Sequence, residues 1–178
     1  AVLRAGNLKL RSGEAQAADE FSRTEGGFSR FNFDVNHVSK LSKVTQFYVF
    51  AHGQLANRNL DSSEQFYLGG ADPVRAYPQG EAGGDSGYQA TAELRYQTPV
   101  KGMSMTVFAD VGEVLARKDG DTSDPHRRLA GWGIGAVYSL DRSLYARLDY
   151  ARKIKGESYR SEAEDKNGRL WFRLYKLF

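Results

Sequence analysis

The chain has 178 residues, the length of one domain, and no cysteine, so a disulfide framework and a cysteine-based zinc site are both excluded. It carries 25 basic and 22 acidic residues, a net charge of +3, with both signs spread along the sequence. A nucleic-acid-binding protein concentrates its basic residues in a patch or tail, and therefore no nucleic-acid partner is expected.

The hydrophobic pattern excludes one kind of membrane protein and permits another. No run of eighteen apolar residues occurs, which excludes a transmembrane helix. The mean hydropathy of −0.57 is compatible with a transmembrane β-barrel, because barrel strands need an apolar residue only at alternate positions. The sequence begins at Ala1 without the charged start and apolar core of a signal peptide, and we expect a mature protein or a fragment.

Period-two alternation predicts eight strands of about ten residues, the length that a tilted barrel strand needs to span a membrane. In chain order the expected strands are 2–11, 28–38, 45–56, 88–98, 103–116, 128–140, 143–154 and 167–178. The alternation is clearest in 88–97, where one face carries Tyr88, Ala90, Ala92, Leu94 and Tyr96. Two tyrosines that bracket small and apolar residues are typical of a lipid-facing strip with interfacial aromatics.

The connections between these strands alternate in length. Long polar connections are expected at 12–27, 57–87, 118–127 and 155–167, and short ones at 39–44, 99–102 and 141–142. A soluble sandwich also alternates in hydrophobicity, but this asymmetry is typical of outer-membrane barrels, which have short periplasmic turns and longer extracellular loops. The pattern places the C-terminus on the periplasmic side, where the last strand ends on Phe178, as outer-membrane barrels commonly do.

Eight strands could close a small barrel or supply half of a larger one. The 31-residue connection 57–87 would sit over a lumen that is wide enough only for side chains in the small barrel. The polar face also carries many charges: Arg95, Arg147, Lys153, Arg169 and Arg173. Both features favour half of a larger barrel, whose two edge strands would be unpaired in isolation.

The long connection contains a dense motif. It reads Phe66-Tyr67-Leu68-Gly69-Gly70-Ala71-Asp72-Pro73-Val74-Arg75-Ala76-Tyr77-Pro78, then Gly80-Glu81, then Gly84-Asp85-Ser86-Gly87, and the next strand contains Glu93-Leu94-Arg95-Tyr96. This pattern resembles the loop-six region of two-partner secretion transporters, the hemolysin-activator family ShlB/FhaC/HecB, which are relatives of the BamA and TamA insertases. The resemblance implies a sixteen-stranded barrel in which five strands follow the loop, and five are expected here.

A second motif, Phe108-Ala109-Asp110-Val111-Gly112, resembles the F-x-D-x-G motif of strand thirteen in that family. Because Phe108 and Asp110 lie two positions apart, both face the lumen, where a carboxylate favours a cation. An arginine supplies two parallel hydrogen bonds, and the resemblance implies that Arg75 makes this contact with Asp110. Such a contact is worth about 4 kcal/mol at an effective dielectric of about 20, before desolvation.

The candidate site therefore has three parts. They are the loop tip, Val74, Arg75, Ala76 and Tyr77; the partner motif, Phe108, Asp110 and Gly112; and the lumenal polar residues Glu93 and Arg95. The family's commonest tip has glycine where this chain has Ala76, whose side chain makes a left-handed backbone less favourable. Gly131, Gly133 and Gly135 share one strand face and would let a loop or another chain approach closely.

The resemblance implies a channel in the outer membrane of a Gram-negative bacterium that translocates a large secreted protein, such as a hemolysin, adhesin or toxin. Its partners would be that protein, with its N-terminal secretion domain, the surrounding lipid, and the barrel assembly machinery acting on the C-terminal strand that ends at Phe178. Residues 1–178 would form the C-terminal half of the barrel, with the N-terminal half and the POTRA domains outside this chain. An insertase of the BamA or TamA kind and a small non-transport barrel remain as alternatives.

No enzyme, cofactor or metal site is expected. Gly84-Asp85-Ser86-Gly87 resembles a serine-protease nucleophile, but His37, His52 and His126 lie on different strands or loops and have no paired spacing for a metal. The glycines of 131–135 lack the strand-to-helix context of a dinucleotide loop. The acidic stretch Asp119-Gly120-Asp121 is interpreted as a solvated loop, with weak calcium binding as the alternative.

Overall fold

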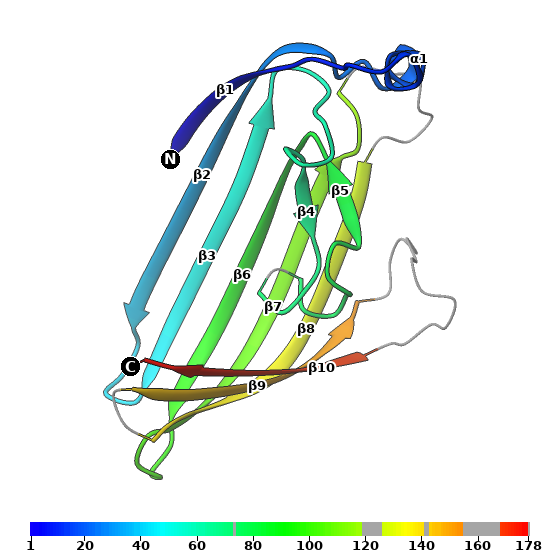
Figure 1. Ribbon diagram of the computed structural model, residues 1–178. Helices are drawn as coiled ribbons and strands as arrows, with labels where there is room; N and C mark the ends of the chain where they lie inside the picture. The colour runs from blue at the N-terminus through cyan, green and yellow to red at the C-terminus, as the bar shows by residue number, and fades with distance from the viewer. Residues whose placement is uncertain (73, 119–125, 141–142, 155–167, 178) are drawn as a thin grey trace.

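The computed structural model describes residues 1–72, 74–118, 126–140, 143–154 and 168–177. Eight antiparallel strands form one sheet in which each strand lies beside its neighbours in sequence (Figure 1). They are β1 (Val2–Leu8), β2 (Gly26–Lys40), β3 (Thr45–Ala56), β6 (Ser86–Gln97), β7 (Met103–Leu115), β8 (His126–Ser139), β9 (Leu144–Lys153) and β10 (Gly168–Lys176). All eight expected strands are present, although the first ends at Leu8 rather than at residue 11.

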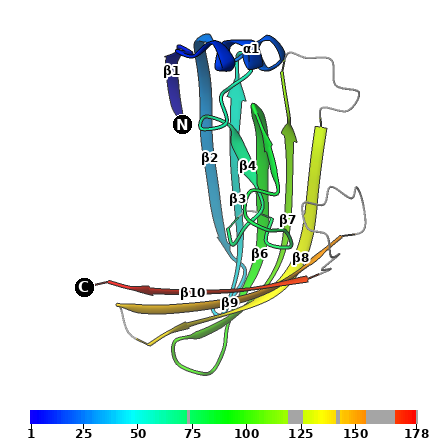
Figure 2. The same ribbon diagram turned by 45° about the vertical axis from the view of Figure 1, so that its right-hand side comes forward.

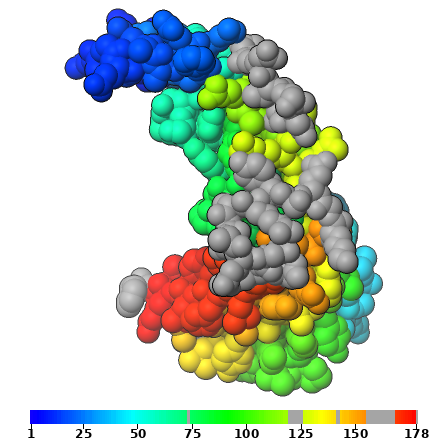
Figure 3. Space-filling view, turned by 90° about the vertical axis from the view of Figure 1, so that its right-hand side faces the viewer, coloured from blue at the N-terminus to red at the C-terminus, as the bar shows by residue number. Residues whose placement is uncertain are grey.

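The sheet is strongly curved and open. Strands β2 to β8 form a trough, and β9 and β10 curl across one end of it (Figure 2). Within the described residues, β1 pairs only with β2 and β10 only with β9, so the sheet does not close on itself. The space-filling view shows the N-terminal segment overhanging the end opposite β9 and β10 (Figure 3). The eight strands therefore form part of a barrel rather than a closed eight-stranded one.

The two faces of the sheet differ as a membrane barrel requires. On β7 the side chains of Met105, Val107 and Val111 are exposed on the convex face, whereas Phe108 and Asp110 are buried on the concave face. The same alternation continues in register on the neighbouring strands, and Phe172 on β10 is 66% exposed. Large apolar side chains on an outward face are those of a transmembrane antiparallel β-barrel.

A helix occupies the first long connection, which the sequence predicted to be a polar loop. Helix α1 (Gly13–Ser22) begins after Ser12, whose side chain accepts a hydrogen bond from the Ala15 amide at 3.2 Å. None of its residues is buried, and therefore the helix has no apolar stripe by which a sequence pattern would reveal it. In the described part of the chain no helix is long and apolar enough to cross a membrane.

The second long connection, residues 57–85, is the inner loop. It contains a hairpin of β4 (Phe66–Leu68) and β5 (Ala82–Gly84), which contacts β7 on the concave face of the sheet. Phe66 and Leu68 pack there with Val114 and Leu129 in one buried apolar cluster. The inner loop thus fills the trough with its own small core, and this core positions the loop tip.

Candidate functional site: the tip of the inner loop

The loop tip is a tight turn buried against the sheet. The Tyr77 amide donates to the Val74 carbonyl at 3.1 Å, and the Gly70 amide donates to the Tyr77 carbonyl at 3.2 Å. Val74, Arg75, Ala76 and Tyr77 are all at most 4% exposed. The left-handed backbone falls on Val74, with φ of 39°, and not on Ala76, so an alanine is accommodated without the strain that the sequence suggested.

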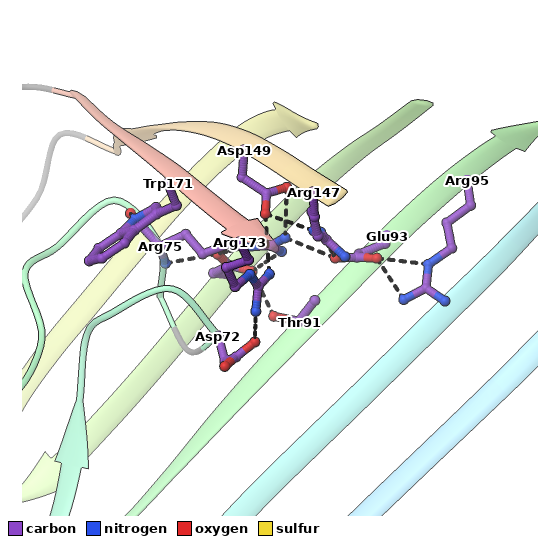
Figure 4. Close-up of polar contacts among 10 residues, drawn as sticks. Asp72, Arg75, Thr91, Glu93, Arg95, Arg147, Asp149, Trp171 and Arg173 are labelled. Carbon is purple, nitrogen blue, oxygen red and sulfur yellow. Dashed lines mark hydrogen bonds and ion pairs between the residues drawn. The ribbon is translucent and has the colours of Figure 1, made fainter. Parts of the chain in front are cut away.

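Arg75 binds Asp110 in the bidentate geometry expected from the motifs, and it lies between Trp171 and Glu93 (Figure 4). The Nε of Arg75 donates to Asp110 Oδ2 at 2.9 Å and its Nη2 to Oδ1 at 2.8 Å, and the Arg75 backbone amide donates to Oδ2 at 3.0 Å. Thr91 donates to Oδ1 at 2.6 Å. The guanidinium carbon lies 3.3 Å from the centre of the Phe108 ring, so the side chain is held by planar stacking as well as by hydrogen bonds.

Glu93 on β6 joins three arginines. Its Oε1 accepts from Arg75 Nη1 at 2.9 Å and from Arg147 Nη2 at 2.8 Å, and its Oε2 accepts from Arg95 Nε at 2.8 Å. Arg95 also lies over the Tyr48 ring, 3.9 Å from its centre. The two lumenal polar residues expected from sequence therefore extend the contact of Arg75 across β6 and onto β3.

Strands β9 and β10 hold the tip from the other side. Asp149 accepts from Arg147 Nε at 2.7 Å and from Arg173 Nη2 at 3.2 Å, and Arg173 also donates to Asp72 of the inner loop. The indole Nε1 of Trp171 donates to the Arg75 carbonyl at 2.7 Å. Residues from β6, β7, β9 and β10 thus converge on one loop residue.

We call this set of charged residues the tip network. It contains four arginines and four carboxylates: Arg75, Arg95, Arg147, Arg173, Asp72, Glu93, Asp110 and Asp149. Its formal charges balance, and Arg75, Asp110 and Asp149 are at most 2% exposed. A buried network of this kind is weak evidence for net stability, but removing one partner leaves a buried charge and costs about 3–5 kcal/mol.

Glycines in the strands make room for the loop. A Cβ placed on Gly131 would lie 2.6 Å from the Cβ of Ala76, and one on Gly112 would lie 2.8 Å from Leu68 Cδ2. These distances are too short for two carbon atoms, so only glycine permits the loop to lie so close. The F-x-D-x-G motif therefore supplies a stacking ring, a carboxylate and a gap for the loop.

A second anchor lies at the rim of the sheet. Asp85, fully buried, accepts from the Leu60 amide at 3.0 Å and from the Lys118 amide at 2.9 Å. Gln54 donates to the Asp85 carbonyl at 3.1 Å. Ser86 accepts from the Ala56 amide at 2.9 Å. The protease-like G-D-S-G segment is thus a structural anchor that ties both ends of the inner loop to the start of the next loop.

The three histidines, which were candidates for a catalytic or metal site, each have a separate local partner. His52 contacts Asp34 at 2.7 Å, His126 contacts Glu113 at 2.7 Å, and His37 contacts Ser39 at 2.7 Å. The stretch 119–121 and Phe178 lie outside the described residues. Sequence reasoning missed Asp72, Asp149 and Trp171 as partners of the tip. Asp149 shares its strand face with Arg147, two positions away, which was the available signal.

These features define a class of protein. An antiparallel sheet with an apolar outer face, a charged inner face and a long loop folded into its curve is part of a transmembrane β-barrel. The family model described as haemolysin secretion/activation protein ShlB/FhaC/HecB matches residues 6–138, and the chain belongs to this family.

Individual relatives agree with this assignment. The heme/hemopexin transporter protein HuxB of Haemophilus influenzae strain Rd is 32% identical over 111 residues, which cover 60% of this chain and 20% of HuxB. HuxB of strain 86-028NP gives the same values. The structure of CdiB from Acinetobacter baumannii has the same fold, with a TM-score of 0.65 at 22% identity, covering 86% of this chain and 27% of that chain. The chain spans about a fifth of the length of the curated relatives it matches.

Proposed function

We propose that this chain forms the C-terminal half of a sixteen-stranded channel that passes a large secreted protein across the outer membrane of a Gram-negative bacterium. The observation that carries the proposal is the inner loop, held inside the trough by Arg75 through contacts with four strands. A loop fixed in this way occupies space through which a translocating polypeptide would pass. The family membership supports the same function.

The expected substrate is a partner protein with an N-terminal secretion domain, such as a hemolysin, adhesin or toxin. POTRA domains outside this chain would receive it in the periplasm. The lumenal surface beside the tip suits an extended polypeptide, because a hollow of about 310 Å³ there is lined by both aromatic and polar side chains. Tyr48, Phe50 and Gln89 are among them.

The tip network has the properties of a contact that is formed at rest and opened during transport. It holds the loop through hydrogen bonds and ion pairs, which water replaces at a small net cost once it enters. The hairpin residue Phe66, which lies against Gly87, and the rim anchor at Asp85 lie nearer the outer end of the sheet than Asp110 does. We therefore place the movement at the tip, with the rim anchor retained.

A disulfide between loop tip and strand tests this proposal, because the described chain has no native cysteine. In the full-length transporter, Ala76→Cys and Gly131→Cys introduce two cysteines whose Cβ atoms would lie 2.6 Å apart. A small shift of the loop brings these Cβ atoms to the separation of about 3.8 Å found in disulfides. Cells carrying the pair should release the partner protein only after reduction. The same pair in its reduced state serves as the control, because it carries both substitutions without the bond.

Secretion by the oxidised pair at the rate of the reduced pair would show that the tip stays in place during transport. A transporter that supports assembly of other outer-membrane proteins, but not release of its partner, would instead act as an insertase of the BamA or TamA kind. The proposed channel predicts neither result.

A further inference from the structure

The outward face of β6 and β7 carries one charged residue. The outward positions run from Ser86 to Tyr96 on β6 and from Met103 to Leu115 on β7, and all of them are uncharged except Glu113. This face contacts lipid in the barrel, where a charge is costly and by default marks a functional site. The placement in lipid rests on the proposed function.

Two basic residues on the next strand accompany this carboxylate. Arg128 is the register partner of Glu113 and donates to it from Nε at 3.0 Å, and His126 Nδ1 lies 2.7 Å from the other carboxylate oxygen. The side chains of Arg128 and His126 are 63% and 51% exposed. Glu113 therefore orients two basic side chains whose outer surfaces remain accessible from the membrane.

An apolar groove begins beside these charges. It measures about 410 Å³ and is lined by Phe33, Leu55, Tyr88 and Leu115, with Glu113 and His126 at its side. Leu55 and Leu115 lie nearer than Glu113 to the end of the sheet that bears the long loops. The charged residues thus sit at the edge of the apolar band and not beyond it.

We propose that this groove, together with Arg128 and His126, binds a phosphorylated lipid of the outer leaflet. An acyl chain would run from the headgroup toward the membrane centre along Phe33 and Tyr88, which lie deeper in the apolar band than Leu55 and Leu115. The phosphate would contact Arg128 and His126, because exposed basic residues at a membrane surface attract anionic headgroups. A lipid fits this place better than a protein partner, since the site faces the bilayer and the groove is lined mainly by apolar and aromatic side chains.

The binding is measured on the full-length transporter in detergent, with bisphosphorylated lipid A as the probe and native mass spectrometry as the readout. Arg128→Gln should weaken lipid A binding by about tenfold or more, because a hydrogen bond to a charged group is lost. Glu113→Gln should strengthen it by a few-fold, since the carboxylate no longer competes with the phosphate for Arg128 and His126. If Glu113 only stabilised the fold, Glu113→Gln would not strengthen lipid A binding while Arg128→Gln weakens it.

Arg152→Gln is the matched control, because Arg152 is an exposed arginine on β9, outside the groove lining, and should leave binding unchanged. Heat-modifiable migration on a gel confirms a folded barrel in every variant, and His126→Gln replaces Arg128→Gln if the latter does not fold. Equal binding of lipid A after removal of its phosphates, or an unchanged affinity in the folded Arg128→Gln variant, would overturn the proposal. Neither result would affect the secretion assay, so failure here is distinct from failure of the channel function.

Discussion

At Arg75 the backbone and the side chain both take part in binding the loop to the sheet. The amide and the guanidinium of this residue donate to the same carboxylate of Asp110, while its carbonyl accepts from Trp171. A lysine could replace the charge but not the two parallel hydrogen bonds or the stacking on Phe108. The loop position therefore depends on arginine as a residue type and not only on positive charge.

Gly131 is the position at which a single methyl group should displace the tip. In Gly131→Ala the new Cβ meets Ala76, and such overpacking costs about 1–3 kcal/mol. We expect faster trypsin cleavage at Arg75 in the folded full-length protein. Gly13→Ala is the control, because nothing lies within 4 Å of that glycine, and it should leave cleavage unchanged. Equal cleavage of both variants would show that the tip does not depend on the gap at Gly131.

The two tryptophans of the chain, Trp171 and Trp132, provide a test variant and its control. Trp171→Phe removes the hydrogen bond to the Arg75 carbonyl and leaves that buried acceptor unpaired, at a cost of about 1–3 kcal/mol. Trp132 faces outward and is 48% exposed, so Trp132→Phe should change stability by less than about 0.5 kcal/mol. Urea unfolding in detergent measures both. Equal free energies of unfolding for Trp171→Phe and Trp132→Phe would show that the Trp171 hydrogen bond does not stabilise the tip.

Among the elements, the eight strands of the sheet were predictable from the sequence, whereas helix α1 and the hairpin of β4 and β5 were not. A strand in a lipid-facing sheet shows its alternation directly, because every second residue of β7 or β8 faces the membrane. Helix α1 has no buried side, and β4 and β5 are three residues each, too short to show a period. Their formation depends on capping and on packing against the sheet, which a local pattern does not contain.

The end of α1 should respond to acid. The Thr24 hydroxyl, and with it backbone amides of Thr24 and Glu25, hold the pKa of Asp19 well below its ordinary value near 3.8. A lowered pKa means that this contribution is present above about pH 3.8 and is lost as the pH falls toward the folded-state value. Hydrogen exchange at the amides of Thr24 and Glu25, measured at equal intrinsic rate, should lose protection in that range. Asp19→Asn should lose most of it already at neutral pH, and unchanged protection would contradict the assignment.

At the scale of the whole molecule, the open sheet explains why one half of the site was visible in the sequence. The motif order and the alternation brought Arg75, Asp110, Glu93 and Arg95 to one face, and the structure places them in contact. The contributions of β9 and β10 depend on how far the sheet curls, because Asp149 and Trp171 reach the tip only across the trough (Figure 4). Curvature is a property of the assembled sheet, and the sequence does not reveal it.

The most direct test of the central claim is secretion of the partner protein by Arg75→Ala and Asp110→Ala variants of the full-length transporter, at equal levels of folded barrel. Each should release at least about tenfold less partner, and the double variant should be no worse than either single one, because contacting residues act as a unit. Arg58→Ala is the matched control: this half-buried arginine of the inner loop donates only to the backbone of Arg23 and Gly27 among the described residues, and its loss should have little effect. Secretion at the wild-type level by both Arg75→Ala and Asp110→Ala would contradict the account.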